Sequence, residues 1–408
     1  METEKRIYLL DPYCSEFSAM VTGSEQVSES QSMVYLDRTS FYPESGGQPS
    51  DTGTLSGRKV TEVRETDRGV GHLVEGSLSV GDKVEGVIDF KRRFDHMQQH
   101  TGQHILSRVF LDLAHLSTAG FHMGERASTI DLQGKAPSAE IIRQAELRAN
   151  RLIYRNLPVN TSEVSREEFE GIGRRYGYQP RSEPPPAAGS IRLVEVEGVD
   201  INACCGTHTQ RTGEIGIIKI TGTERVRKNT RIEFLCGYRA LADYLDKSRI
   251  LSETASVFST SHTGLVEMVE KVSAENIDLK KKVRSLKEEI ASSRAQALDA
   301  GGEIAGHSMV NRELKDVEPA LLGKMAGEMR EDGVEIILLG VGGDKPALVF
   351  ACSPGLDLDM SEILKEAAEV MGARGGGSGD FARGGGGDPS RLKETLQRGE
   401  ELVRKRLD

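Results

Sequence analysis

Residues 95–113 read DHMQQHTGQHILSRVFLDL, a stretch without proline whose apolar positions, such as Ile105 and Val109, recur at helical spacing. Within it, His100 and His104 stand four residues apart. Residues at this spacing lie on one face of an α-helix, so both imidazoles can reach the same ion. The stretch therefore predicts a helix that carries two candidate metal ligands on one face.

A second motif, CCGTH, occupies residues 204–208, in a glycine-containing turn after an expected strand. A thiolate and an imidazole four residues apart in a tight turn can converge on one ion. The two motifs together offer a set of donors that suits Zn²⁺. Its members are His100, His104, Cys204 and His208. Two further candidates are His96 and Cys205. The alternative is that each pair is incidental. A metalloprotease motif is excluded, because no Glu lies between His100 and His104.

The composition sets limits on the class of protein. The chain has 408 residues and a formal net charge of −10. This charge argues against a protein that binds nucleic acid through a uniformly basic surface, but it is compatible with local basic surfaces. No window approaches the ~18 apolar residues of a membrane span, and the polar start lacks a signal-peptide core. We therefore expect a cytoplasmic protein without a membrane segment. Five cysteines, an odd and sparse count, argue against a disulfide framework and favour metal binding or catalysis.

The charge is unevenly distributed. Residues 1–90 hold 16 acidic and 8 basic residues, whereas residues 171–231 and 372–408 are net positive, by +4 and +2. Arg225 and Lys228 belong to a basic group on an expected hairpin. Such groups are usually solvated faces, but next to a metal site and a glycine-rich loop they become candidate phosphate contacts.

Clusters of turn-forming residues and changes in hydrophobic periodicity divide the chain into four parts. Residues 1–90 read as short strands at 7–10, 33–36 and 84–90, which suits a small β-barrel or sandwich. Residues 91–237 alternate helices, at 95–113 and 138–156, with strands at 191–196, 215–220 and 231–235; a loop is expected at 184–189. Residues 238–299 read as helical, and residues 300–408 as strands at 334–339 and 347–351 with helices at 360–371 and 390–407.

Two segments of the second half leave alternatives open. From residue 265 a heptad seam can be read, with Asn276 at one a position, a device that fixes register in coiled coils. The seam predicts either an inter-chain coiled coil or a helix packed in a hairpin against residues 238–258. Further on, nine glycines between Gly372 and Gly387 favour a structured loop, which lets phosphates or other backbone approach, over a flexible linker.

Two more stretches contain polar and glycine residues of interest. Residues 39–51 read TSFYPESGGQPSD, where consecutive glycines suit a tight turn or close approach to a ligand, and where a plain hairpin is the simpler interpretation. Residues 120–132 contain His122 and Asp131. His122 fits either a pocket or the solvent-facing side of a strand; taken alone, the second is favoured.

These motifs, in this order, resemble the AlaX family of alanyl-tRNA editing proteins in its long form, and also the editing half of alanyl-tRNA synthetase. The resemblance rests on residues 39–51, 100–104, 120–132 and 204–208, the helical stretch 238–290 and the glycine-rich segment 375–389. It implies an α+β protein with an N-terminal β-barrel (1–90), a zinc-containing α+β editing domain (91–237), a helical or coiled-coil linker (238–299) and a C-terminal glycine-rich α/β domain of DHHA1 type (300–408). No segment resembles a class II aminoacylation domain, so editing in trans without tRNA charging is expected.

The resemblance also assigns residues. It implies one Zn²⁺ per chain held by His100, His104, Cys204 and His208, with Cys205 standing where the family has glycine. It implies substrate selection by Gly46, Gly47 and Gln48, and tRNA binding and dimer formation by the C-terminal domain. Our candidates for the reaction are Thr39 and Gln103. Further candidates are His122 and Asp131 for substrate binding, and Arg225, Lys228 and Arg383 for tRNA binding.

The expected reaction is hydrolysis of the ester in Ser-tRNA(Ala), with Gly-tRNA(Ala) as a second candidate, by direct attack of water. A site that charges alanine rejects serine or glycine poorly, whereas a second site can demand the serine hydroxyl through a hydrogen bond. Thr39 is the first candidate for that contact. The alternatives are a non-catalytic tRNA-binding module, a zinc hydrolase of other esters, and editing of a threonyl ester.

Overall fold

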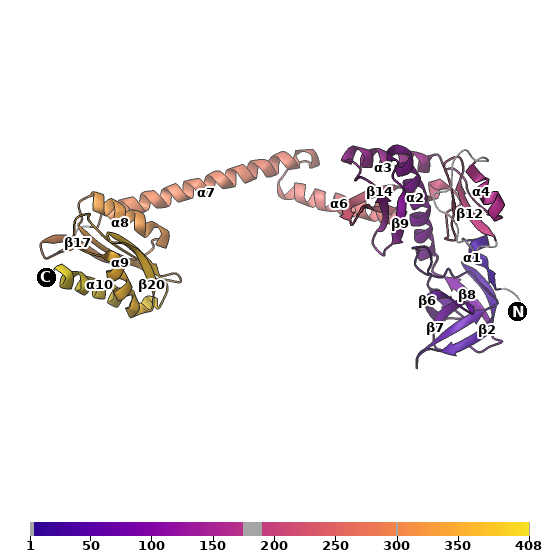
Figure 1. The fold of residues 1–408 in the computed structure, drawn as a ribbon, viewed down its shortest axis with the longest axis horizontal. Helices are drawn as coiled ribbons and strands as arrows, with labels where there is room; N and C mark the ends of the chain where they lie inside the picture. The colour runs from indigo at the N-terminus through magenta and orange to yellow at the C-terminus, as the bar shows by residue number, and fades with distance from the viewer. Residues whose placement is uncertain (1–3, 174–189, 299–300, 408) are drawn as a thin grey trace. The chain divides into compact units, whose positions relative to one another are not determined.

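The computed structural model describes residues 4–173, 190–298 and 301–407 (Figure 1). The loop predicted at residues 184–189 lies outside these ranges. The chain divides into two compact units, Met1–Thr254 and Ala255–Asp408. Mixed α and β structure, as predicted, is present in both units. Among the described residues, no helix combines the length and the apolar character that crossing a membrane requires.

The first unit begins with a closed β-barrel. Its strands alternate buried and exposed residues, as in β2, because successive side chains in a strand point to opposite faces. The inward side chains, among them Val34 and Val63, form one apolar core. Around the barrel the strands run in the order β2 (Glu16–Gln26), β3 (Gln31–Leu36), β7 (Gly69–Glu75), β6 (Arg58–Thr66), β5 (Gly53–Leu55) and β8 (Lys83–Ile88).

One predicted strand in this region is wrong. Residues 7–10 form the one-turn helix α1 (Ile7–Leu10), which follows the two-residue strand β1 (Lys5–Arg6). A four-residue apolar run has too little length for its period to distinguish strand from helix. The pairing that was expected of residues 7–10 is made instead by β1, which lies parallel to β4 (Arg38–Thr39).

The predicted helix at 95–113 is α2 (Phe90–Ala114), which begins five residues earlier than expected. The side chain of Asp89 accepts a hydrogen bond from the backbone N–H of Arg92 at 3.1 Å and so caps the first turn. At the other end, His115 adopts a left-handed conformation with φ 55° and ends the helix. The earlier start matters, because the added turn brings Lys91 and Arg92 onto the same helix as the histidine pair.

Helices α2 and α3 (Ala139–Tyr154) pack together and against a four-stranded sheet. Their apolar side chains, such as Val109 and Ile153, join those of Ile130 and Phe234 in one core. Strand order in this sheet is β14 (Ile218–Val226), β15 (Asn229–Cys236), β10 (Ser128–Gln133) and β9 (Thr118–Met123). A smaller sheet holds β11 (Val159–Val164), β12 (Ile191–Val196) and β13 (Asp200–Ala203), with the short helix α4 (Arg166–Glu170) following β11. Because β13 ends at Ala203, the CCGTH motif forms the turn that leaves this sheet.

Two long helices occupy the predicted helical stretch, α6 (Gly237–Val257) and α7 (Leu265–Gln296). Most of the apolar seam predicted on α7 is exposed: Val269, Val272, Leu279, Val283, Leu286 and Ile290 show 40–60% of their surface to solvent. The C-terminal turns of α7 are different, because Ala291 and Ala295 are buried in the core of the second unit.

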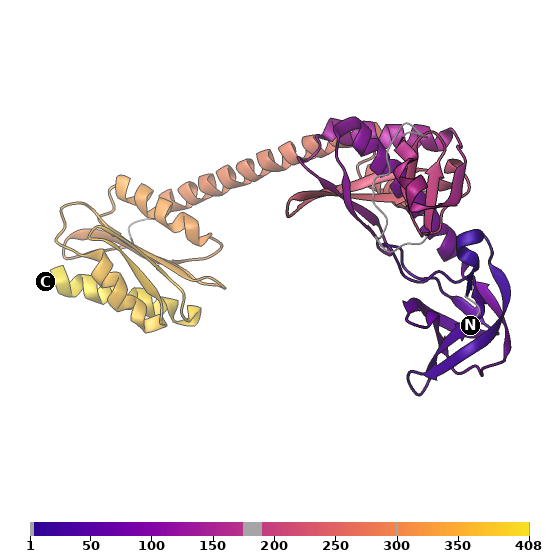
Figure 2. The ribbon, with the colours of Figure 1, turned by 45° about the vertical axis from the view of Figure 1, so that its right-hand side comes forward.

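The second unit is built on a six-stranded mixed sheet with helices on both faces (Figure 2). Strand β18 shows why: Ile337 and Leu339 pack under α8 (Leu322–Glu331), whereas Ile336 and Leu338 pack under α9 (Met360–Ala368) and α10 (Leu392–Leu407). The strand order is β16 (Gly302–Ile304), β17 (His307–Leu314), β18 (Ile336–Val341), β19 (Ala347–Cys352), β21 (Phe381–Gly385) and β20 (Arg374–Ser378).

The glycine-rich segment supplies the last two strands of that sheet. A Cβ atom at Gly375 would overlap Leu364 of α9, and one at Gly377 would overlap the carbonyl oxygen of Phe381. Much of the glycine content therefore allows a helix and a neighbouring strand to approach the backbone closely.

Candidate metal centre

The two histidines of α2 lie one helical turn apart and point to the same place. His100 and His104 are both buried, and their ring centroids are 5.5 Å apart. The ring of His208 lies 4.4 Å from that of His100 and 5.0 Å from that of His104. Helix α2 thus presents two imidazoles to a third that comes from the turn after β13.

That turn is held tightly against the helix. The backbone N–H of Thr209 donates to Thr101 Oγ1 at 3.0 Å, and Arg192 donates to the carbonyl oxygens of Cys204 at 2.8 Å and Gly206 at 3.1 Å. A Cβ atom on Gly206 would overlap the imidazole of His100. Only glycine therefore lets the turn come this close to α2.

The four predicted donors meet at one point. One ligand atom from each of His100, His104, Cys204 and His208 lies within 4.8 Å of all the others. Cys204 Sγ lies 3.4 Å from His100 Nε2 and 3.6 Å from His208 Nε2. Two such ligands on a tetrahedral Zn²⁺ would be about 3.6 Å apart, from Zn–S of about 2.3 Å and Zn–N of about 2.0–2.1 Å. The donor set and its spacing fit that ion.

Hydrogen bonds on the far side of two imidazoles orient their Nε2 atoms toward the other donors of the cluster. His104 Nδ1 lies 3.2 Å from the carboxylate of Asp200, and His100 Nδ1 lies 2.9 Å from Gln48 Oε1. Carboxylates and amides in this position fix the tautomer and the ring orientation of metal-binding histidines. The Nδ1 atom of His208 is buried and, within the described residues, has no such partner.

The electrostatics favour the protonation states that metal binding requires. Burial alone would raise the pKa of Cys204, but its interactions with His100 and His208 outweigh burial and bring that pKa well below its usual value. Burial is also the main reason why the pKa of His208 falls to about 3. The two shifts favour the deprotonated thiol and the neutral imidazole, the forms that bind divalent metals.

A cavity of about 290 Å³ opens onto three of these donors. Residues from the loop 40–52 between β4 and β5 (the barrel loop), from α2, from β9, from the end of β13 and from the CCGTH turn line it. They are Tyr42, Ser45, Gly46, His100, Gln103, His104, Thr118, Ala119, Gly120, Phe121, Asn202, Ala203, Cys204, Cys205 and Gly206. We call this cavity the cluster cleft.

Of the two predicted reaction residues, Gln103 lines the cluster cleft and Thr39 does not. Gln103 Nε2 donates to Ser107 Oγ at 2.8 Å, which turns the amide and leaves Oε1 without a partner among the described residues. Thr39 is fully buried, and its hydroxyl lies 2.7 Å from His72 Nε2. The structure therefore brings Gln103, and not Thr39, to the donors.

The consecutive glycines have separate positions. Gly46 lines the cluster cleft, whereas Gly47, at φ 85°, packs against β9, where its carbonyl accepts from Met123 N at 2.9 Å. Gln48 is fully buried behind the donors and bridges His100 to Thr207, to which it donates at 2.8 Å. The simple hairpin interpretation of residues 39–51 misses this bridge, because it depends on segments more than fifty residues away.

The remaining predicted residues lie away from the cluster cleft. His122 is exposed on β9 and lines a different cavity, and Asp131 forms an ion pair with Arg231 at 2.8 Å. Arg225 and Lys228 are exposed at the β14–β15 turn, and Arg383 lies over the ring of Phe381 in the second unit.

Sequence reasoning missed Asp200, Asn202, Tyr42 and Ser45. Asp200 stands four residues before Cys204, but nothing in the sequence marks it as a partner of His104. Of the two surplus candidates, His96 lies outside the donor set, and Cys205 lines the cleft without joining it.

Three family models match this chain. The threonyl and alanyl tRNA synthetase second additional domain matches residues 191–233, which include β12 and the CCGTH turn. The DHHA1 domain matches residues 306–405, and the class II (A) tRNA synthetases match residues 12–92. The last match corrects the expectation that no segment resembles a class II aminoacylation domain, because residues 12–92, which include the whole barrel, match the model of the class II (A) synthetases.

A relative of similar length decides the family. The alanyl-tRNA editing protein AlaX-L of Pyrococcus horikoshii is 31% identical over 393 residues, which cover 93% of this chain and 94% of that protein. The chain belongs to the AlaX-L family of alanyl-tRNA editing proteins.

This AlaX-L family member is also similar to larger proteins. It is 36% identical to the alanine–tRNA ligase of Methanothrix thermoacetophila and 34% identical to that of Natronomonas pharaonis, over its whole length in both comparisons. It covers 45% and 44% of those ligases, so it spans about half the length of these relatives. The C-Ala domain of Aquifex aeolicus alanyl-tRNA synthetase aligns with 26% of the chain at 24% identity, with a TM-score of 0.24.

Proposed function

We propose that the chain is a trans-acting aminoacyl-tRNA deacylase, which hydrolyses the ester of Ser-tRNA(Ala), and of Gly-tRNA(Ala) as a second substrate, and does not itself charge tRNA. Membership of an alanyl-tRNA editing family supports this proposal. The observation that carries it is a buried cluster of three imidazoles and one thiol that opens into a cleft.

We propose one Zn²⁺ per chain, held by His100, His104, Cys204 and His208. When bound, zinc supplies a Lewis-acidic charge that polarises or positions the ester. Asp200 and Gln48 hold two of the imidazoles with Nε2 toward that position. Cys204 is the proposed sulfur ligand because its thiol lies among the imidazoles and has a lowered pKa, whereas Cys205 is an exposed residue outside the donor set.

Gln103 is the residue best placed to act on the substrate. Its free Oε1 can accept a hydrogen bond from an attacking water or from the serine hydroxyl, while Ser107 holds the other end of the amide. A site that bonds that hydroxyl leaves its own polar group unpaired when alanine enters, so alanyl esters are spared.

For Thr39 we propose an indirect contribution. Its hydroxyl accepts a hydrogen bond from Phe41 N at 3.1 Å, at the start of the loop that brings Tyr42 and Gly46 to the cleft. Gly46 would then shape the substrate end of the cleft, and Gly47 and Gln48 would fix the loop against β9 and the donors.

The tRNA partner would be bound by both units. Arg225 and Lys228 stand exposed on a hairpin of the first unit, and Arg383 on the glycine-rich hairpin of the second. The exposed seam of α7 is the proposed surface for a homodimer, formed as an inter-chain coiled coil. The intrachain hairpin is its alternative, and a cytoplasmic location remains a prediction.

The test is a deacylation panel with the full chain. Ser-, Gly-, Ala- and Thr-esters of tRNA(Ala) are incubated with the wild type, with His104→Ala and with the matched control His115→Asn. His115 is exposed and left-handed, a conformation that asparagine tolerates. We expect hydrolysis of the seryl ester, sparing of the alanyl ester, and a loss of more than about 100-fold in His104→Ala alone.

No hydrolysis of any ester by the wild type would refute the enzymatic function. Equal hydrolysis of seryl and alanyl esters would refute the selectivity, and full activity of His104→Ala would refute the metal centre.

A further inference from the structure

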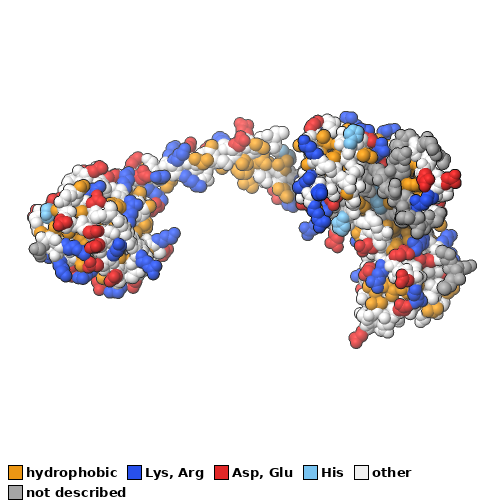
Figure 3. Space-filling model, viewed as in Figure 1, with side chains coloured by type: hydrophobic (Ala, Val, Ile, Leu, Met, Phe, Trp, Pro, Cys, Tyr) orange, Lys and Arg blue, Asp and Glu red, His pale blue; other side chains and the backbone are white. Residues whose placement is uncertain are grey.

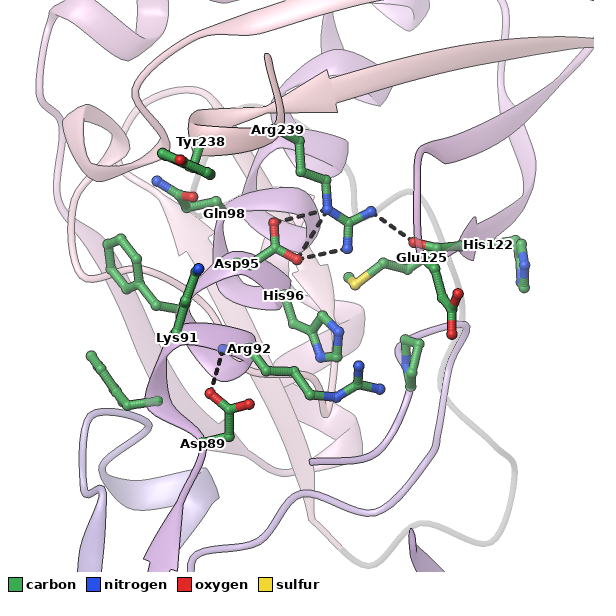
Figure 4. A pocket seen from close by; sticks show the side chains of 15 residues that line it. Asp89, Lys91, Arg92, Asp95, His96, Gln98, His122, Glu125, Tyr238 and Arg239 are labelled. Atoms are coloured by element: carbon green, nitrogen blue, oxygen red, sulfur yellow. Dashed lines mark hydrogen bonds and ion pairs between the residues drawn. The ribbon is translucent and has the colours of Figure 1, made fainter. Parts of the chain in front are cut away.

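A second and larger cavity lies in the first unit, at the N-terminal end of α2. Its volume is about 890 Å³, within the range of ligand-binding pockets. It shares no lining residue with the cluster cleft. The lining comes from the barrel loop, α2, β9 and the start of α6: Pro49, Asp89, Phe90, Lys91, Arg92, Phe94, Asp95, His96, Gln98, His122, Met123, Gly124, Glu125, Tyr238 and Arg239 (Figure 4). We call it the α2 pocket.

One wall of the α2 pocket carries an exposed aromatic ring. Tyr238 shows 65% of its surface, although a ring of this size is usually mostly buried in a monomer. The ammonium group of Lys91 lies 5.8 Å from the centre of that ring. Figure 4 shows both side chains on the same side of the pocket, with Gln98 near them. A flat ring beside a cation is the arrangement on which proteins stack the bases of single-stranded nucleic acids.

Two cations of the pocket are free to contact a phosphate. Within the described part of the chain, no carboxylate pairs with Lys91 or Arg92; the only bond of the Arg92 side chain is from Nε to the carbonyl of Ser50, at 3.1 Å. Arg239 is different, because it is held by Asp95 at 2.6 Å and by the carbonyl of Gly124 at 2.7 Å.

The pocket also contains acidic groups, but two of the three are engaged. Asp95 is neutralised by Arg239, and Asp89 caps the first turn of α2. Glu125 is exposed on the rim. The lining thus holds three cations and three carboxylates, and Lys91 and Arg92 are the two cations that no carboxylate pairs among the described residues.

A buried histidine in the pocket lacks a partner. His96 is only 2% exposed, and its Nδ1 atom makes no hydrogen bond among the described residues. Buried polar atoms of this kind are nearly always paired, so an unpaired one that lines a cavity indicates a ligand or water that completes it. A neutral imidazole offers one donor and one acceptor, which suits the edge of a base or a ribose hydroxyl.

The α2 pocket adjoins the metal centre. His96 precedes His100 by one helical turn, about 6 Å along the axis. The two cavities also lie on either side of the same loop and strand, because Gly46 and Phe121 line one while Pro49 and His122 line the other. The α2 pocket is therefore a neighbour of the cluster cleft on the same helix, loop and strand.

We propose that the α2 pocket binds the nucleotide that precedes the esterified terminal adenosine of the tRNA, with its base stacked on Tyr238 and its phosphate at Lys91 and Arg92. The inference rests on the proposed function, since it requires the ester of the terminal adenosine to lie in the cluster cleft. By binding this nucleotide, the α2 pocket would let the enzyme distinguish an aminoacyl ester on RNA from a small-molecule ester. The metal centre alone would not make this distinction.

The test compares two substrates that differ only in the upstream nucleotides. One is serine esterified to adenosine, and the other is serine esterified to the trinucleotide CCA; kcat/KM is measured for both. The variants are Tyr238→Ala and Lys91→Gln, and the controls are Tyr154→Ala and Lys83→Gln, which are exposed and outside both cavities.

We expect the wild type to prefer the trinucleotide ester about tenfold or more, the value of one stacked base with its phosphate contact. Tyr238→Ala and Lys91→Gln should each reduce that preference severalfold, and the controls should keep it. If the variants retain the full preference, or if the wild type has none, the inference is overturned. If the wild type cleaves neither ester nor any charged tRNA, the proposed function itself fails, and the inference falls with it.

Discussion

The cluster cleft and the α2 pocket share helix α2 but differ in how their polar groups are held. In the cleft, His100 and His104 are buried and fixed from behind by Gln48 and Asp200. In the pocket, Tyr238 and Lys91 are exposed, and buried His96 has an unpaired nitrogen. Side chains with fixed orientation suit a metal that tolerates little error in geometry, whereas exposed rings and cations suit a flexible strand of RNA. Figure 3 shows how widely basic and acidic side chains are interspersed over the visible surface, so charge alone would not have located either site.

Among substitutions that distinguish the two sites, removal of the proposed sulfur ligand should reduce activity most. Cys204→Ala removes a donor that lies 3.4 Å from His100 Nε2, while Cys205→Ala alters an exposed neighbour. We expect Cys204→Ala to lose bound zinc and to lower deacylation by more than about 100-fold, beyond the effect of residues that only support a ligand. Zinc content by mass spectrometry and deacylation of Ser-tRNA(Ala) are the measurements. The reverse ranking, with Cys205→Ala the more damaging, would move the ligand to Cys205.

A smaller effect should come from the support behind the ligands. Asp200→Asn keeps the size of the side chain but removes the charge that orients His104. Such changes typically weaken metal affinity by about 10–100-fold. Competition with a chelator measures this directly, and Asp246→Asn at an exposed position of α6 serves as the matched control. Unchanged affinity in Asp200→Asn would show that the histidine is oriented by packing alone.

The smallest expected effect is a decrease in the stability of the fold at acidic pH, caused by His96 of the α2 pocket. Burial, followed by the charge of Arg92, lowers the pKa of His96 from 6.5 to about 3. The folded form therefore gives up this proton more readily than the unfolded chain. The stabilisation is complete above about pH 6.5 and is lost as the pH falls toward 3.

Between pH 7.5 and 5.5, this histidine should lower the free energy of unfolding by about 1.4 kcal/mol, and His96→Gln should remove that part of the pH dependence. Urea unfolding of wild type and variant at the two pH values, both stripped of metal, measures the difference. Parallel pH profiles would show that His96 is not buried in its neutral form in solution.

The sequence was sufficient to find the four donors, because each pair is local. His100 and His104 are separated by one helical turn, and Cys204 and His208 by one tight turn, so spacing alone predicts that each pair converges. The barrel strands β3 and β8 and the helices α2 and α3 follow in the same way from short-range periodicity. The strand prediction at residues 7–10 was wrong because four residues are too few to show a hydrophobic period.

Contacts between distant segments could not be read from the sequence. Thr39 stands in a motif that suggests a ligand, yet its side chain points into the barrel toward His72. His122 and Asp131 were grouped by proximity in the chain, but both face away from the donors, Asp131 toward Arg231. The α2 pocket is likewise assembled from four segments, and its exposed tyrosine, Tyr238 at the start of α6, lies more than a hundred residues from the α2 residues that line it.

The most direct test of the account is a zinc titration of the metal-stripped full chain, followed by deacylation of Ser-tRNA(Ala) at each step. The account predicts that activity is absent in the stripped protein, rises in proportion to added zinc and saturates at one ion per chain. Full activity in the metal-free protein would contradict it.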